Sequence, residues 1–112
     1  MIDDGWVSVG RPDDVPMLEG RSVRIGERRV AVFRLPAGWA ALDHACPHSG
    51  GPLADGIVSA TCVTCPLHGW RFDLRTGVRE GGSERIETHE VQERDGVLWL
   101  RVAADGGLAE AA

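Results

Sequence analysis

The sequence lacks the features that would direct it to a membrane or to nucleic acid. Its 112 residues contain no apolar run approaching the roughly 20 residues that a membrane span needs. The acidic start, Met1–Gly5, has no pattern of a secretory signal, so we expect a cytoplasmic protein. A net charge of −5, with twelve arginines scattered along the chain, argues against a nucleic-acid or anionic-membrane surface.

The length allows one domain and the pattern is almost entirely strand and turn. Short alternating segments predict an all-β fold, and Asp95-Gly96 is a strong hairpin signal. No helix of convincing length and no internal repeat is indicated. We predict strands at Trp6–Val9, Val23–Ile25, Arg28–Leu35, Trp39–Leu42, Trp70–Asp73, Arg85–Glu93 and Val97–Val102, and a flexible tail over residues 104–112.

Cysteine is scarce, but all three cysteines lie close together with two of the four histidines. Two of the cysteines and both histidines form the motifs Cys46-Pro47-His48 and Cys65-Pro66-Leu67-His68, each in a loop dense in turn-forming residues. The third cysteine is Cys62. In a cytoplasmic protein, closely spaced thiols are more often metal ligands or redox groups than structural disulfides. Two Cys and two His also make a tetrahedral zinc site, although zinc sites usually pair like ligands on each loop. Chance packing of small apolar residues remains the simplest alternative.

The chain resembles the Rieske iron–sulfur family, on CPHSGGPL and CPLHGWRFDLRTG and on the strands around them. The resemblance covers Trp6 to about Val102 and implies one domain over residues 1–103. The implied fold is a base of small antiparallel sheets with a cluster-binding part inserted at about residues 43–72. It also implies that a [2Fe–2S] cluster is held by two ligands on each iron: Cys46 and Cys65 on one, His48 and His68 on the other.

Four further positions indicate a low-potential member of that family. The high-potential branch has a disulfide between its ligand loops, and the corresponding positions here are Gly51 and Leu67. Its serine and tyrosine, which donate hydrogen bonds to sulfur, correspond to Trp70 and Phe72. Hydrogen bonds to sulfur raise the potential, so their loss predicts the low end of the Rieske range, about −150 mV.

Neutral imidazoles in place of two thiolates remove negative charge from the cluster, which makes reduction easier than in an all-cysteine cluster. By the resemblance, the histidine edges reach the surface. We therefore expect His48 and His68 to form the electron exit route, with outer nitrogens that titrate with redox state.

Several residues near the motif are interpreted as structural. We expect Cys62 to be a small buried residue on a short strand, and His44 and His89 to be structural or surface residues. The stretch Glu80–Ser83 lacks the prolines with which many family members cover the cluster, so we expect looser shielding on that side. Trp70 is a candidate shield. The remaining tryptophans are expected in the core: Trp6, Trp39 and Trp99.

The predicted function is one-electron transfer by a soluble component rather than a complete enzyme. The chain has no G-x-G-x-x-G dinucleotide fingerprint and no length for an oxygenase catalytic domain. HSGGPLADG and HGWRFDLRTG look most like the small subunit of assimilatory NAD(P)H nitrite reductases. The alternatives are a ferredoxin of a ring-hydroxylating dioxygenase system and, in another class, a zinc-bound or cluster-free assembly domain. Larger redox proteins are the expected partners.

Overall fold

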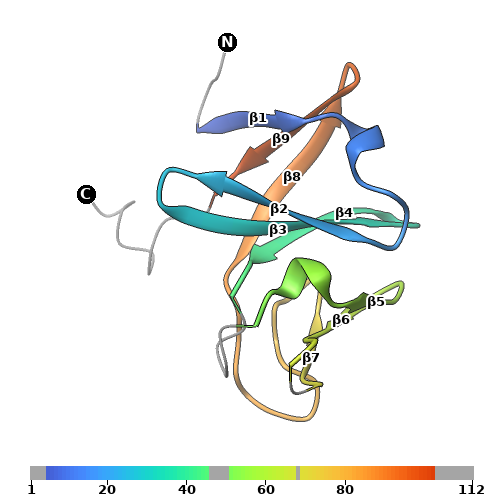
Figure 1. Cartoon of the computed structure of the whole chain (residues 1–112), viewed down its shortest axis with the longest axis vertical. Coiled ribbons are helices and arrows are strands. Elements are labelled where there is room, and N and C mark those ends of the chain that lie inside the picture. Colours follow the sequence, from blue (N-terminus) through green and yellow to red (C-terminus); the bar gives the residue numbers. More distant parts are fainter. Residues whose placement is uncertain (1–4, 46–50, 68, 103–112) are drawn as a thin grey trace.

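The fold consists of two antiparallel sheets, and the structure, a computed structural model, describes residues 5–45, 51–67 and 69–102. The larger sheet has six strands in the order β1-β9-β8-β4-β3-β2 (Figure 1). The predicted tail, residues 104–112, lies outside the described residues. The strands of the six-stranded sheet are β1 (Trp6–Gly10), β2 (Gly20–Ile25), β3 (Arg28–Leu35), β4 (Gly38–Asp43), β8 (Thr88–Arg94) and β9 (Val97–Arg101).

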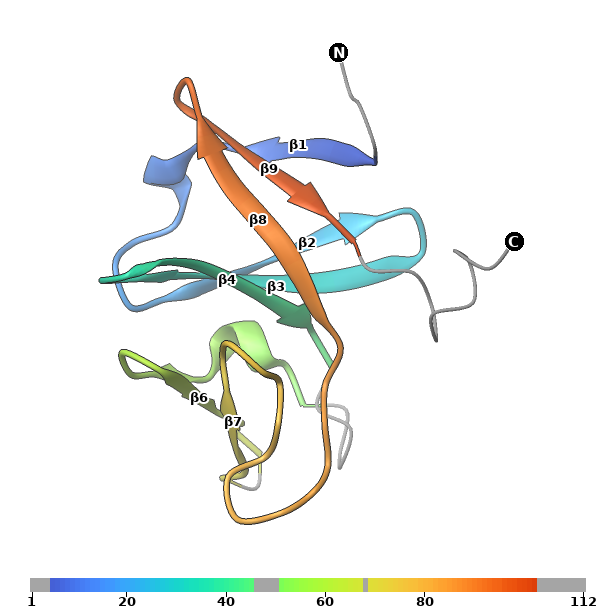
Figure 2. The same ribbon diagram turned by 180° about the vertical axis from the view of Figure 1, so that it is seen from behind.

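The smaller sheet is inserted between β4 and β8 and lies below the larger sheet in Figures 1 and 2. Its order is β5-β6-β7, with β6 in the centre. Two 3₁₀ turns complete the described elements: η1 (Pro12–Asp14), after β1, and η2 (Leu53–Asp55), which leads into the small sheet. The all-β prediction is therefore confirmed. The three strands are β5 (Ile57–Val58), β6 (Cys62–Thr64) and β7 (Arg71–Asp73).

Local turn chemistry explains two of the hairpins in the larger sheet. Between β8 and β9, Asp95 and Gly96 have φ of 53° and 77°, as a type I′ turn requires. Between β2 and β3 the turn includes Gly26, with φ of 64°. The sequence predicts the first of these hairpins from Asp95-Gly96.

The strand β3 is buried on both faces and divides the core in two. On one face, Val30 and Val32 pack with Ala41 and Leu100 within the larger sheet. On the other face, Ala31 and Phe33 belong to a second cluster that joins the two sheets. That second cluster also contains Leu42, Leu53, Ala54, Val63, Cys65, Phe72, Leu74 and Ile86. The small sheet is thus fixed to the larger one by shared apolar burial.

A latch closes the point where the insertion leaves and rejoins the larger sheet. The backbone N–H of Asp43 donates to the carbonyl of Glu87 at 3.0 Å. The carboxylate of Asp43 is 2.8 Å from Nε2 of buried His89 and 3.3 Å from Nη2 of Arg28. Burial raises the pKa of Asp43, but the His89 hydrogen bond and the Arg28 charge outweigh it and lower the pKa below 3.8. The structural interpretation of His89 is confirmed.

The prediction that three tryptophans are core residues is wrong, because each is only half buried. An arginine covers each ring instead, with Cζ 4.9–5.6 Å from the ring centroid. The indole has a polar N–H and a large flat face, so it fits a boundary position under a cation better than a full interior. The pairs are Arg101 over Trp6, Arg34 over Trp39 and Arg94 over Trp99.

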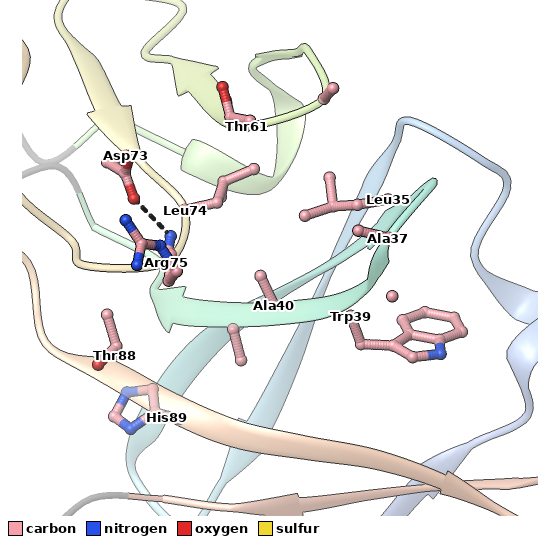
Figure 3. A pocket seen from close by; sticks show the side chains of 13 residues that line it. Leu35, Ala37, Trp39, Ala40, Thr61, Asp73, Leu74, Arg75, Thr88 and His89 are labelled. Carbon is pink, nitrogen blue, oxygen red and sulfur yellow. Dashed lines mark hydrogen bonds between the residues drawn. The ribbon is translucent and has the colours of Figure 1, made fainter.

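A cleft of about 430 Å³ lies between β4 and the insertion (Figure 3). Leu35, Ala40 and Leu74 line its apolar part, while Thr61 and Arg75 contribute polar atoms. Within the described residues, no helix has the length and apolar character needed to cross a membrane.

Candidate metal centre

Of the four predicted ligands, only Cys65 falls within the described residues. Cys46, His48 and His68 lie outside them. Cys65 directly follows β6 and is 1% exposed, in the cluster of apolar side chains between the two sheets. In the part of the chain that the structure describes, no group of three or more His, Cys, Asp or Glu side chains could hold a metal ion.

A closed loop holds Cys65 in place. Its backbone N–H donates to the carbonyl of Trp70 at 2.7 Å, and its carbonyl accepts from the N–H of Gly69 at 3.1 Å. Gly69 has φ of 75°, a left-handed conformation that glycine adopts without steric cost. The loop therefore presents Cys65 from a fixed backbone, as a metal-binding thiolate requires.

Space beside the Cys65 sulfur is kept by a glycine from the first ligand loop. A Cβ at Gly51 would lie 2.7 Å from Sγ of Cys65, closer than real contacts allow. The same Cβ would lie 3.2 Å from Cγ of Leu67, so positions 51 and 67 face each other. These are the two positions that hold a disulfide in the high-potential branch, and here a glycine and a leucine occupy them.

The residues around the sulfur fit an iron–sulfur cluster. A soft thiolate in an apolar pocket with a glycine beside the sulfur is the donor environment that such clusters use. Leu67 and Gly69, on either side of His68, are both exposed, and Leu67 is 55% exposed. The second ligand loop thus has its thiol inside and its neighbouring residues at the surface.

The structural interpretation of Cys62 is confirmed. It starts β6, is 8% exposed and carries a free thiol. Its Sγ donates toward a carboxylate oxygen of Glu80 at 3.5 Å. Val63 and Thr64 of β6 separate it from Cys65, so the two thiols lie on one short segment of the chain.

His44 anchors the start of the first ligand loop, which confirms its structural interpretation. Its backbone N–H donates to the carbonyl of Arg29 at 3.1 Å, and its carbonyl accepts from Leu53 at 3.0 Å. Its Nδ1 accepts from the N–H of Ala54 at 3.4 Å. Burial and the charge of Arg29 lower the pKa of His44, and Asp55 opposes this only in part. The neutral ring is therefore favoured.

A further contact at this site, which no sequence pattern indicates, is that of the Arg79 guanidinium with the ring of Trp70. Arg79 Cζ lies 3.5 Å from the centroid of the Trp70 ring. Trp70 is half buried and packs against the same apolar cluster as Cys65. Its ring also lies 6.3 Å from that of Phe72. Such a contact joins side chains from two loops, and only their arrangement in space reveals it.

The chain belongs to the Rieske [2Fe-2S] domain family, which it matches over residues 5–93. It therefore binds a [2Fe-2S] cluster and serves in electron transfer. The predicted [2Fe-2S] cofactor is therefore confirmed, and the zinc-bound or cluster-free alternative is not supported, because the family is defined by its [2Fe-2S] cluster.

Two curated relatives illustrate the range of the family. The chain is 47% identical over 79 residues to cholesterol 7-desaturase nvd 1 of Ciona intestinalis, covering 65% of this chain and 16% of that protein. It is 29% identical over 99 residues to the anthranilate 1,2-dioxygenase ferredoxin subunit of Burkholderia cepacia, covering 87% and 92%. For three of the curated relatives that it matches, the first of these two included, the chain spans only 16–48% of their length.

Two solved structures share the fold. One is assigned as the small subunit of a nitrite reductase (NADPH), with a TM-score of 0.77 and 25% identity over 85% of this chain and 96% of that one. The other is a complex of reduced oxygenase and oxidized ferredoxin in carbazole 1,9a-dioxygenase, with a TM-score of 0.79 and 24% identity. That match covers 88% of this chain and 94% of the other. Fold neighbours of this chain thus include a protein of a ferredoxin–oxygenase complex.

Proposed function

We propose that the chain is a low-potential electron carrier of the nitrite reductase small-subunit type, acting in the cytoplasm. Cys46 and Cys65 would bind one iron of the cluster, and His48 and His68 the other. The observation that carries this assignment is the buried thiol of Cys65 in a loop closed on itself, with Gly51 leaving room beside the sulfur.

The bound cluster would supply a site that accepts and releases one electron. The protein's own residues would do the rest. The apolar cluster around Cys65 excludes water and so limits the solvent that must reorganise with each electron. Leu67 and Gly69, the residues on either side of His68, are exposed. This exposure supports electron exit at the second ligand loop, because a partner protein would contact the surface there.

Low potential is supported by the side chains at positions 70 and 72. Trp70 and Phe72 carry no hydroxyl, and Phe72 is fully buried. A cluster sulfur therefore receives no hydroxyl hydrogen bond from either position. The expected potential is at the low end of the Rieske range, about −150 mV.

Two systems compete as the source of the partner. The motifs HSGGPLADG and HGWRFDLRTG, together with the fold likeness to an assigned nitrite reductase small subunit, favour nitrite reduction. The ferredoxin alternative has its own support, because a dioxygenase ferredoxin subunit matches over most of both chains. In either system, the chain would be a component and the catalytic site would lie in a larger protein.

The ligand assignment is tested by one substitution at two neighbouring cysteines. Cys65→Ser should abolish the visible absorption and the reduced-state EPR signal of the cluster, because the thiolate is a ligand. Cys62→Ser, three positions earlier in the chain and also buried, should leave both nearly unchanged. Bleaching by Cys62→Ser would contradict the assignment. His68→Ala should behave as Cys65→Ser does.

The partner is tested by electron transfer from the reduced protein. A sirohaem nitrite reductase and a ring-hydroxylating terminal oxygenase, each from the same source organism, would be mixed with it in a stopped-flow instrument. Faster oxidation by the sirohaem enzyme supports the proposal. Faster oxidation by the oxygenase would establish the ferredoxin function instead. The genes next to this one give an independent indication.

A further inference from the structure

The proline-free stretch after β7 forms a well-defined hairpin over residues 77–86, here called the Arg79 hairpin. The backbone N–H of Arg79 donates to the carbonyl of Glu84 at 2.8 Å. The N–H of Ile86 donates to the carbonyl of Gly77, also at 2.8 Å. Hydrogen bonds within the hairpin therefore hold it in shape where other family members use proline.

The Arg79 hairpin is also fastened to the small sheet. Phe72 and Arg79 form an antiparallel bridge, and the N–H of Glu80 donates to the carbonyl of Arg71 at 2.7 Å. An ion pair joins the side chains of Arg71 and Glu80 at 3.5 Å. The hairpin thus extends the edge of β7, the strand that directly follows Trp70.

The Arg79 guanidinium stacks on one side chain and donates a hydrogen bond to another. The ring of Trp70 lies against it, 3.5 Å from Cζ to the ring centroid. Nη1 of Arg79 donates to the carboxylate of Glu84 at 3.1 Å. A Cβ at Gly82 would lie 2.6 Å from Glu84 Oε1 and 3.0 Å from Arg79 Nη1, so the ion pair occupies space that only glycine leaves.

Trp70 connects this ion pair to the second ligand loop. Its carbonyl accepts the N–H of Cys65, and its ring packs on the apolar cluster that contains Cys65. A movement of Trp70 would therefore open the loop that carries the thiol. It would also admit water to the cluster site on the side of Glu80–Ser83, where this chain has no prolines to cover the site.

We propose, resting on the proposed function, that Arg79 is a positioning residue of the cluster site. Arg79 clamps Trp70 over the second ligand loop as a shield against water, and it keeps a positive charge on that side of the site. The shield lengthens the lifetime of the cluster in air. The charge favours the reduced state, because the added electron makes the cluster more negative.

The test compares Arg79→Met with Arg94→Met in the intact, cluster-containing protein. Methionine keeps much of the apolar length but removes the charge and the planar group. Arg94 is the matched control, because it covers Trp99 in the larger sheet, with Cζ 5.6 Å from the ring centroid. The measurements are the midpoint potential and the rate at which the visible absorption bleaches in air-saturated buffer.

Arg79→Met should bleach about three- to ten-fold faster than the wild type and have a more negative potential. Arg94→Met should match the wild type in both. Arg79→Lys separates the two effects, since it keeps the charge but loses the flat guanidinium. It should retain the wild-type potential and still bleach faster.

Equal bleaching rates in Arg79→Met, Arg94→Met and the wild type would overturn the proposal. If Arg79→Met does not fold, Glu84→Gln serves in its place, because it releases the Arg79 side chain with almost no change in size. Faster bleaching of Glu84→Gln supports the clamp, and an unchanged rate contradicts it. A wild-type protein that never acquires a cluster contradicts the proposed function itself, and its colourless spectrum shows this before any variant is compared.

Discussion

Gly51 and Cys65 come from different ligand loops, and a single methyl group on Gly51 would reach to 2.7 Å from the Cys65 sulfur. The sulfur cannot move aside as the end of a long side chain can, because it is only one bond from Cβ of a buried residue. The space beside the sulfur is therefore as much a part of the site as the sulfur.

Gly51→Ala should prevent cluster assembly or reduce its occupancy several-fold, because the methyl group takes the space next to the ligand. Iron content and visible absorption of the purified protein measure this. Gly26→Ala is the control: it strains a left-handed turn, with φ of 64°, but its Cβ would meet nothing within 4 Å. It should cost about 1 kcal/mol of stability and leave the cluster in place. Full occupancy in Gly51→Ala would contradict the steric argument.

Leu67→Ser should slow electron transfer to the partner about ten-fold without moving the midpoint potential. Leu67 precedes His68 and is 55% exposed, so it offers an apolar contact to a docking protein at the proposed exit. Stopped-flow oxidation by the partner checks the rate. Met17→Ser, with a similar exposure of 51% in the connector between η1 and β2, should have no effect. An equal loss of rate in both variants would contradict docking at the second ligand loop.

Asp43→Asn should destabilise the fold near neutral pH by about 1 kcal/mol, by weakening the bonds to His89 and Arg28 at a half-exposed site. The pKa of Asp43 in the folded protein is below 3.8, so folding favours its charged form. That contribution is present above pH 3.8 and is lost as the pH falls through the lower, folded value.

Urea unfolding over a range of pH measures this effect, with Asp13→Asn as the control for an exposed carboxylate. The gap between Asp43→Asn and the wild type should narrow in acid. A gap that stays constant from neutral pH down to below the folded pKa would show that the charge of Asp43 contributes nothing.

Asp73→Ala should destabilise the protein by about 1–2 kcal/mol, and Asp73→Asn by less. Oδ1 of Asp73 accepts the backbone N–H groups of Arg75 at 2.8 Å and Thr76 at 2.9 Å, which forms the turn after β7. The Thr76 hydrogen bond is the main cause of a lowered pKa at Asp73. Asparagine keeps an acceptor for this turn and alanine does not. Thermal unfolding ranks the variants, and equal losses would contradict a hydrogen-bonding role.

The sequence predicted those parts of the fold that depend on local turn chemistry. The Asp95-Gly96 hairpin is one example, because Asp-Gly is a dipeptide that favours the left-handed conformations of a type I′ turn. The strand predicted from Arg85 instead begins at Thr88, since Arg85 belongs to the Arg79 hairpin and pairs only with Val78. The two-residue strand β5 is too short to give a periodic pattern.

At the site, the spacing of Cys and His predicted the chemistry but not its surroundings. Gly51 was identified by its residue type, as a position without cysteine, and its contact with the Cys65 sulfur emerged only from the fold. The Arg79–Trp70 stack could not be predicted, because cation–π contacts leave no periodicity or spacing in a sequence. The same holds for the arginines that cover Trp6, Trp39 and Trp99.

The latch at Asp43 has an evolutionary consequence. The chain leaves the larger sheet at Asp43 and returns at Glu87, and a hydrogen bond between these two residues joins the points of departure and return. Whatever lies between them can change in length and composition while the six-stranded frame keeps its register. Selection could therefore change the potential or the choice of partner by changing the inserted loops while the six-stranded sheet stays the same, much as antibodies vary loops on a constant framework.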